Sequence, residues 1–407
     1  MQISLTMAGK NPDPLPDLIV VGGGLAGSLV ALALARWRPE LRVELVEAGA
    51  QFGGEHVWSF FASDIDEAHR ALVEPLVAKR WSGYDILFPG YARELSTHYA
   101  SVTSASLDAE IRAALPEDRL HTRVAVREMG PTWIELADGS RREARGVIDA
   151  RGSHGLAHMS GGWQKFMGQT LRLAAPHGLT RPVVMDARVE QIDGYRFVYC
   201  LPFSQTQVFV EDTYYSDDPG LDLPVLRQRI GAYAQSRGWQ VEAVDYEETG
   251  VLPVIARGDF ARFWQGDVAR AGVRAALVQP LTSYSLPDAV RFAAHLTTLD
   301  NLSGERLGRI SHDWAANHWR KGRFYRMLST MLFGAAPPQE RWRMLARFYK
   351  LPEPLIERFY AGRSTLADMA RVLVGKPPVP IGAAVAALAG RGRALADLDP
   401  RGAGEVA

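Results

Sequence analysis

The glycine-rich turn that follows the first predicted strand constrains the fold of this chain more than any other feature. The stretch "DLIVVGGGLAGSLVALALARW" begins with the apolar run Leu18 to Val21, passes through three glycines, and continues as an Ala- and Leu-rich helical pattern. The stretch "LRVELVEAG" then supplies a second short strand over residues 43–46. Two strands joined by a helix of this length form a right-handed βαβ unit in a parallel sheet.

The spacing of the glycines and of one acid predicts a dinucleotide site in this unit. Gly22, Gly24 and Gly27 follow the strand directly, and Glu47 ends the next strand. Gly22 allows the tight turn, Gly24 lets the backbone approach a pyrophosphate, and Gly27 permits close helix packing, while the helix N-terminus favours the anion. Glu47 would accept hydrogen bonds from an adenosine ribose. NAD and FAD both fit this pattern.

Composition excludes several classes of protein. Lys plus Arg and Asp plus Glu number 46 each, so no net field favours nucleic acid. The single cysteine, Cys200, cannot form an intrachain disulfide, which fits a reducing cytosol, and we interpret it as a small buried apolar residue. The longest apolar runs are well short of the roughly 18 residues of a transmembrane helix. We therefore expect a soluble protein or one at a membrane surface, without a signal peptide.

The order of predicted strands and helices indicates an α/β fold with several segments. The predicted boundaries are a flexible leader over 1–16, a dinucleotide-binding domain over 17–160, a β-rich domain over 161–262, a return to the first domain over 263–310, a helical region over 311–390 and a flexible tail over 391–407. The long insertion between the βαβ unit and the return segment is typical of two-domain flavoproteins, by analogy of fold.

One strand of the β-rich segment ends in two acids. In "TQVFVEDTYY" the apolar run Val208 to Val210 leads into Glu211 and Asp212. Burying a carboxylate beside such residues costs several kcal/mol unless it is paired or protonated. At the exposed end of a strand, by contrast, the pair would have no special role.

An ordered series of stretches resembles the bacterial flavoprotein-type lycopene beta-cyclases of carotenoid biosynthesis. The series comprises "GGEHVWSF" (53–60), "VIDARG" (147–152), "PHGLTRPVVMDARVEQIDGYRFVYCLPF" (176–203), "VFVEDTYY" (208–215), "QPLTSYSLPDAV" (279–290), "FYRMLSTMLF" (324–333) and "GKPPVP" (375–380). The resemblance implies a two-domain, glutathione-reductase-like flavoprotein that binds FAD, with NADPH or NADH as reductant. It implies an isomerase that converts lycopene through γ-carotene to β-carotene without net redox change, in the cytoplasm and peripherally on the membrane.

The resemblance also carries residue roles. The FAD-binding candidates are Gly22, Gly24, Gly27, Glu47, Gly54, Asp149, Gly152, Pro280 and Tyr284. The chain departs from the family's usual pattern at Gln279 and Ser283, where relatives commonly have His and Gly, and at Glu55 and Val57, where Asn and Thr are usual. Ser283 would restrict backbone approach to a flavin if its position requires a positive φ.

Cyclisation of an isoprenoid end group begins with protonation of an alkene, which requires a protonated acid in contact with it. The family's acidic motif falls on Glu211 and Asp212, and Glu211 is the predicted acid because apolar surroundings raise a carboxyl pKa. On a strand Asp212 would point to the other face. The candidates for the substrate pocket are Trp58, Phe60, Tyr195, Tyr199 and Tyr214, each of which could equally be a core residue.

Three further polar residues have two interpretations each. His56 and His177 are either proton relays or hydrogen-bonded structural residues, and Asp186 is either a second catalytic carboxylate or a turn cap. No HExxH or CxxC motif is present, so no metal is predicted.

The stretch "HWRKGRFYRMLSTMLF" (318–333) mixes aromatic, apolar and basic residues. It is either an interfacial helix on a membrane or a buried helix with solvated arginines.

Two other functions fit parts of the sequence. An FAD-dependent monooxygenase or an isoprenoid reductase would share the nucleotide unit and would consume oxygen or hydride with product formation. A non-catalytic carotenoid- or flavin-binding protein would account for the departures at Gln279 and Ser283. The sequence does not specify the oligomeric state.

Overall fold

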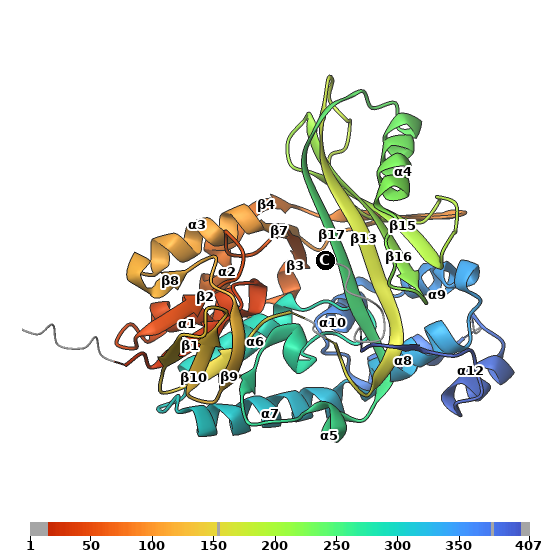
Figure 1. Ribbon diagram of the computed structural model, residues 1–407. Helices are drawn as coiled ribbons and strands as arrows, with labels where there is room; N and C mark the ends of the chain where they lie inside the picture. Colours follow the sequence, from red (N-terminus) through yellow and green to blue (C-terminus); the bar gives the residue numbers. More distant parts are fainter. Residues whose placement is uncertain (1–14, 153–154, 376–377, 400–407) are drawn as a thin grey trace, which may run out of the picture.

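The computed structural model describes residues 15–152, 155–375 and 378–399 (Figure 1). The predicted leader lies outside the described residues except for its last two positions, and the end of the predicted tail also lies outside them.

A parallel five-stranded sheet is built around the glycine turn. Its strand order is β18–β12–β1–β2–β8, with bounds Ala269–Arg270, Val147–Asp149, Leu18–Val21, Val43–Val46 and Leu120–His121. Helix α1 (Leu25–Trp37) crosses from β1 to β2 and packs against α6 (Leu286–Thr297). The predicted βαβ unit is therefore confirmed, because β1 pairs in parallel with both β2 and β12.

A second, long sheet forms the other side of the molecule (Figure 1). Its order is β17–β13–β16–β15–β14–β5–β6, with β19 also paired to β13. The bounds in chain order are β5 Tyr84–Phe88, β6 Tyr91–Leu95, β13 Met159–Leu173, β14 Val183–Asp186, β15 Tyr195–Pro202, β16 Gln207–Ser216, β17 Val241–Gly258 and β19 Ala396–Asp397. Neighbours are antiparallel except β5 and β14.

This long sheet differs from the predicted β-rich segment at two places. Strands β5 and β6 come from the segment that we predicted to belong wholly to the first domain. Strand β19 pairs with Ser160 and Gly161 and is followed by the buried Leu398, although the tail was predicted to be flexible. All three strands are short, and they join the sheet through the pairing of β5 with β14 and of β19 with β13, which are distant in sequence.

Smaller sheets and helices complete the fold. One antiparallel sheet contains β9 (Val126–Gly130), β10 (Trp133–Leu136) and β11 (Arg141–Glu143); another contains β3 (Val57–Phe61), β4 (Val77–Trp81) and β7 (Tyr99–Thr103). The main remaining helices are α3 Ser104–Ala114, α4 Leu223–Ser236, α7 Gly304–Lys321, α8 Arg323–Gly334, α9 Trp342–Phe348, α10 Glu353–Tyr360, α11 Leu366–Leu373 and α12 Ile381–Leu388. The predicted α/β class with a helical C-terminal region is confirmed.

Candidate active site

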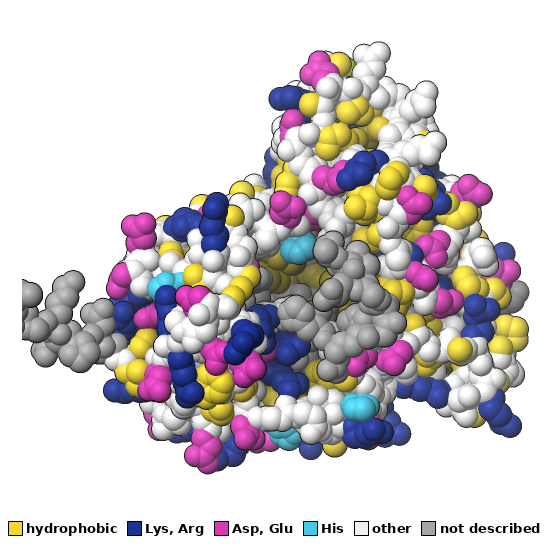
Figure 2. Space-filling model, viewed as in Figure 1, with side chains coloured by type: hydrophobic (Ala, Val, Ile, Leu, Met, Phe, Trp, Pro, Cys, Tyr) yellow, Lys and Arg dark blue, Asp and Glu magenta, His cyan; other side chains and the backbone are white. Residues whose placement is uncertain are grey.

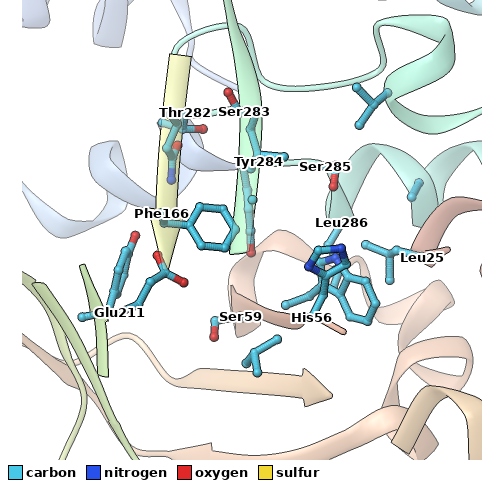
Figure 3. A pocket seen from close by; sticks show the side chains of 18 of the residues that line it. Leu25, His56, Ser59, Phe166, Glu211, Thr282, Ser283, Tyr284, Ser285 and Leu286 are labelled. Atoms are coloured by element: carbon cyan, nitrogen blue, oxygen red, sulfur yellow. The ribbon is translucent and has the colours of Figure 1, made fainter. Parts of the chain in front are cut away.

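A cavity of about 440 Å³ lies between the parallel sheet and the long sheet. The surface is hollowed there, with hydrophobic side chains inside the hollow (Figure 2). One end of the cavity is lined by Gly24, Leu25 and Ala26 at the start of α1, and the other by Glu211 on β16. Figure 3 shows Leu25 and Glu211 on opposite sides of this space. The cavity therefore joins the glycine turn to the acidic strand.

The glycine turn has the geometry that the sequence predicts. Gly22 has φ +102°, and a Cβ there would lie 2.7 Å from the backbone of Ala150. A Cβ on Gly27 would lie 2.0 Å from the Gly22 oxygen. Gly24 instead faces open space, with nothing within 4 Å of an added Cβ. An open backbone at a helix N-terminus fits the pyrophosphate of a dinucleotide.

Only some of the other predicted cofactor residues line the cavity. Gly152 and Tyr284 line it directly, whereas Gly54, Asp149 and Pro280 do not. The Glu47 carboxylate accepts 2.6 Å hydrogen bonds from Gly23 N–H of the glycine turn and from Gly49 N–H, so it stabilises that turn. The Asp149 carboxylate is paired with the guanidinium groups of Arg151 and Arg274, each at 3.0 Å.

Strand β16 directs its two acids to opposite faces. Alternate side chains of a strand point to opposite sides. Phe209, Glu211 and Tyr215 accordingly line the cavity. Asp212 is fully buried on the other face, where Arg196 binds it at 2.7 Å and Tyr214 donates a 2.6 Å hydrogen bond to it. Asp212 is therefore paired within the protein, whereas Glu211 is the one of the two acids that lines the cavity.

The surroundings of Glu211 favour its protonated form. Burial raises the pKa of Glu211 to about 7; the hydrogen bond from Thr213 opposes this shift and the nearby Asp212 charge adds to it. The Thr213 hydroxyl donates to Glu211 Oε1 at 2.5 Å. The carboxyl group extends toward Ser59 beneath the Phe166 ring (Figure 3). A carboxyl group with this pKa can donate a proton at neutral pH.

A second buried carboxyl group, Glu248, was not predicted from the sequence. Gly168 on β13 stands opposite Glu211 on one side and opposite Glu248 of β17 on the other, so both acids share one face of the sheet. Glu248 Oε2 accepts a 2.8 Å hydrogen bond from Val57 N–H and lies 3.8 Å from His56 Nδ1. Burial raises its pKa well above the ordinary value, and the charge of Glu211 adds to the effect. No local motif marks Glu248, because its position depends on strand register.

The predicted aromatic residues divide between cavity and core. Trp58 and Tyr199 line the cavity. Phe60 and Tyr195 are core residues, and Tyr214 lies with Asp212 on the far face. Residues that line the cavity and were not predicted include Tyr99, Phe166, Tyr215 and Tyr360.

The loop before α6 bears the two departures from the family pattern. Ser283 has φ +55°, the left-handed conformation that favours glycine, and its hydroxyl donates to the Pro253 carbonyl at 2.6 Å. The Gln279 side-chain oxygen accepts from Leu281 N–H and Thr282 N–H and so holds the turn. Gln279 is therefore bonded within the loop, and Ser283 bonds the loop to β17.

Tyr284 of the same loop is bonded to a further buried acid. Its hydroxyl donates to Asp64 Oδ2 at 2.7 Å, and Phe61 N–H donates to the same oxygen at 2.8 Å. Burial raises the pKa of Asp64 to about 7, against these hydrogen bonds. Asp64 Oδ1 has no hydrogen-bond partner among the described residues.

Of the three polar residues with two interpretations, His177 and Asp186 are hydrogen-bonded within the protein and His56 lines the cavity. The ring nitrogens of His177 bond to the Ser204 carbonyl and to Leu179 N–H, which fits the hydrogen-bonded structural alternative. Asp186 accepts from Arg188 N–H at 3.2 Å and pairs with its guanidinium group, which is the turn-cap alternative. His56 lines the cavity. Cys200 is fully buried, as predicted.

The stretch 318–333, which we considered as an interfacial helix, is packed into the protein. Trp319 stacks on Phe260, and α8 lies along β17, where Thr330 donates to the Ala256 carbonyl at 3.2 Å. The buried side chains of α8 include Tyr325, Leu328 and Phe333. The buried-helix alternative is therefore the one that the structure bears out. Across the described residues, no helix has both the length and the apolarity needed to cross a bilayer.

Solved structures with similar folds are flavoproteins of low sequence identity. A geranylgeranyl bacteriochlorophyll reductase-like protein from Thermoplasma acidophilum aligns over 89% of this chain and 96% of its own, with a TM-score of 0.56 and 13% identity. The p-nitrophenol 4-monooxygenase of Pseudomonas putida aligns over 88% and 97%, with a TM-score of 0.56 and 17% identity. These likenesses support the flavoprotein fold.

Sequence relatives are much closer. A lycopene beta-cyclase of Pseudescherichia vulneris is 45% identical over 90% of this chain and 96% of its own, and one of Pantoea ananas is 43% identical over 92% and 98%. Residues 17–386 match the family described as lycopene cyclase protein. The chain therefore belongs to the lycopene cyclase family, as the ordered resemblance of its sequence indicated.

Proposed function

We propose that this chain is a lycopene beta-cyclase that converts lycopene through γ-carotene to β-carotene. The observation that carries the proposal is the Glu211 carboxyl group, which faces an apolar cavity and whose pKa of about 7 is raised by burial. An uncharged, strong enough acid in contact with an alkene is what this reaction requires. Membership of the lycopene cyclase family supports the same substrate.

The reaction is a proton-balanced isomerisation. The Glu211 hydroxyl gives its proton to the terminal double bond of the polyene, which leaves a tertiary carbocation and a Glu211 carboxylate. The neighbouring double bond attacks the cation and closes the ring. A ring carbon then releases a proton to the Glu211 carboxylate, which restores the acid, so no atom is gained or lost. Tyr199 and Tyr215 line the cavity beside Glu211 and can stabilise the cation through their ring faces.

The glycine turn supports FAD as the cofactor. Gly24 and the first turn of α1 would hold its pyrophosphate, Glu47 its adenosine ribose, and Gly152 and Tyr284 line the cavity where the rest would lie. When bound and reduced, the flavin supplies negative charge that stabilises a carbocation without net electron transfer. NADPH or NADH as the reductant, and a cytoplasmic protein that is peripherally bound to the membrane, complete the proposal.

Expression in cells that accumulate lycopene tests the function. Chromatography and mass spectrometry should show β-carotene of unchanged mass, and Glu211→Gln should keep flavin absorbance while losing this product. Asp212→Asn is less informative, because it breaks the ion pair with Arg196. A product whose mass differs by oxygen or hydrogen would instead support a monooxygenase or reductase, and flavin binding without any product would support a binding protein.

A further inference from the structure

Large apolar side chains are exposed mainly in one part of the chain. Among the described residues, nine large hydrophobic side chains are exposed, and six of them lie between residues 366 and 388. They are Leu366, Leu373, Val374, Ile381, Val385 and Leu388, on α11, α12 and the turn after α11. Leu366 is 83% exposed and Ile381 is 69% exposed. We call these six residues the apolar surface.

A second cavity lies directly behind the apolar surface. Its volume is about 210 Å³, and the lining includes Leu373, Ile381, Val385 and Leu388 of the apolar surface together with buried residues of α8, α9 and α10. Among the described residues of the lining, Arg347 is the single charged one, and its guanidinium group donates to the Val372 carbonyl at 3.2 Å. The cavity is therefore suited to an uncharged hydrocarbon.

The second cavity borders the cavity of Glu211. Thr282 and Tyr360 line both, so one wall separates the two spaces. Lycopene is a linear polyene too long for its far end to stay beside Glu211 while one end reacts. A neighbouring apolar cavity provides space for the rest of the chain.

The exposed charged side chains described between residues 369 and 396 are arginines, and Asp368 on α11 is buried and paired with Arg358. Residues 369–396 contain no Asp or Glu. Arg371 and Arg391 in this stretch are exposed, and neither forms an ion pair with another described residue. An apolar face with flanking basic residues is the pattern of proteins that bind anionic lipid surfaces. Figure 1 places α12 at the edge of the molecule, away from the parallel sheet, where a flat partner can reach it.

We propose that the apolar surface docks on a lipid bilayer containing anionic headgroups, and that the second cavity is the passage by which the polyene passes from the bilayer toward Glu211. The proposal rests on the proposed function, because it assigns the route of that substrate. It also moves the expected membrane contact from residues 318–333, which are packed in the protein, to α11 and α12.

Vesicle flotation of the full chain tests the docking surface. The variant Leu366→Ser with Val374→Ser changes two exposed residues that do not line the second cavity. The matched control, Val241→Ser with Val244→Ser, changes two exposed valines of β17. The wild type and the control should float with vesicles of phosphatidylcholine and phosphatidylglycerol, and the docking variant should bind at least about tenfold more weakly. Equal flotation of the docking variant, or a wild type that stays unbound, would overturn the docking proposal.

A second variant tests the passage. Val385→Trp places a large side chain at the mouth of the second cavity, and circular dichroism and flavin absorbance check that it folds. We expect it to float like the wild type but to cyclise vesicle-borne lycopene at least about fivefold more slowly, in line with a blocked apolar site. Wild-type turnover in this variant would refute the passage. Absence of product from the wild type with both detergent-dispersed and vesicle-borne lycopene would refute the proposed function instead, and the flotation result would stand independently.

Discussion

Replacing Thr213 by Val should extend activity to higher pH. The Thr213 hydroxyl donates to Glu211 Oε1 at 2.5 Å, and this bond holds down a pKa that burial raises to about 7. Valine has nearly the same shape and cannot donate, so the carboxylate of Glu211 loses a stabilising contact. Because the protonated acid starts the reaction, a higher pKa keeps the enzyme active at higher pH.

The expected shift follows from the energy of that bond. A hydrogen bond to a charged group contributes about 1.5–3 kcal/mol. One pKa unit corresponds to about 1.4 kcal/mol, so the pKa of Glu211 should rise by about one to two units. At pH 9 about 1% of the wild-type acid is protonated, and the variant should be at least about tenfold more active there, relative to its own maximum.

The assay is the initial rate of β-carotene formation at saturating lycopene between about pH 6 and 10, measured by chromatography. The alkaline limb of the rate profile should move to higher pH in Thr213→Val. Glu211→Gln should be inactive at every pH, as expected if Glu211 is the proton donor. An unmoved limb, or one moved to lower pH, would refute the assignment of Glu211 as the acid.

The remaining predictions concern stability. The folded-state pKa of Glu211, about 7, exceeds its ordinary value of 4.5, so the stability of the wild type should fall as pH rises through this window. Glu211→Gln should therefore unfold at a higher temperature than the wild type at pH 9 but not at pH 5. Calorimetry that shows the same difference in unfolding temperature at both pH values would contradict this. Ser283→Ala should be less stable than Ser283→Gly by about 1 kcal/mol in urea unfolding, because only alanine keeps the cost of positive φ after the bond to Pro253 is lost; the opposite order would argue against φ +55°. Arg196→Leu should cost about 3–5 kcal/mol by leaving Asp212 buried and unpaired, and a second change, Asp212→Leu, should recover much of the loss; a double variant that is no better than the single one would contradict the pairing.

The sequence by itself determined the features that depend on neighbouring residues. The run Leu18–Val21, the glycine turn and the helix after it have local conformational preferences strong enough to specify a βαβ unit. The alternation of side chains along a strand likewise placed Glu211 and Asp212 on opposite faces before any partner was known. The ordered resemblance, which spans most of the chain, indicated the family.

Only the tertiary structure decided which distant residues meet. Glu248 shares a face with Glu211 because β13 separates their strands in register at Gly168, and Asp64 bonds to Tyr284 across 220 positions. The mixed apolar and basic stretch 318–333 fits a membrane interface as well as a protein core. An amphipathic pattern indicates that one face of a helix is covered, but it does not specify whether lipid or protein covers that face. Packing against β17 buries α8 and leaves the apolar faces of α11 and α12 exposed. The free energy that makes this choice comes from burying surface between elements that are far apart in the chain, which no local pattern contains.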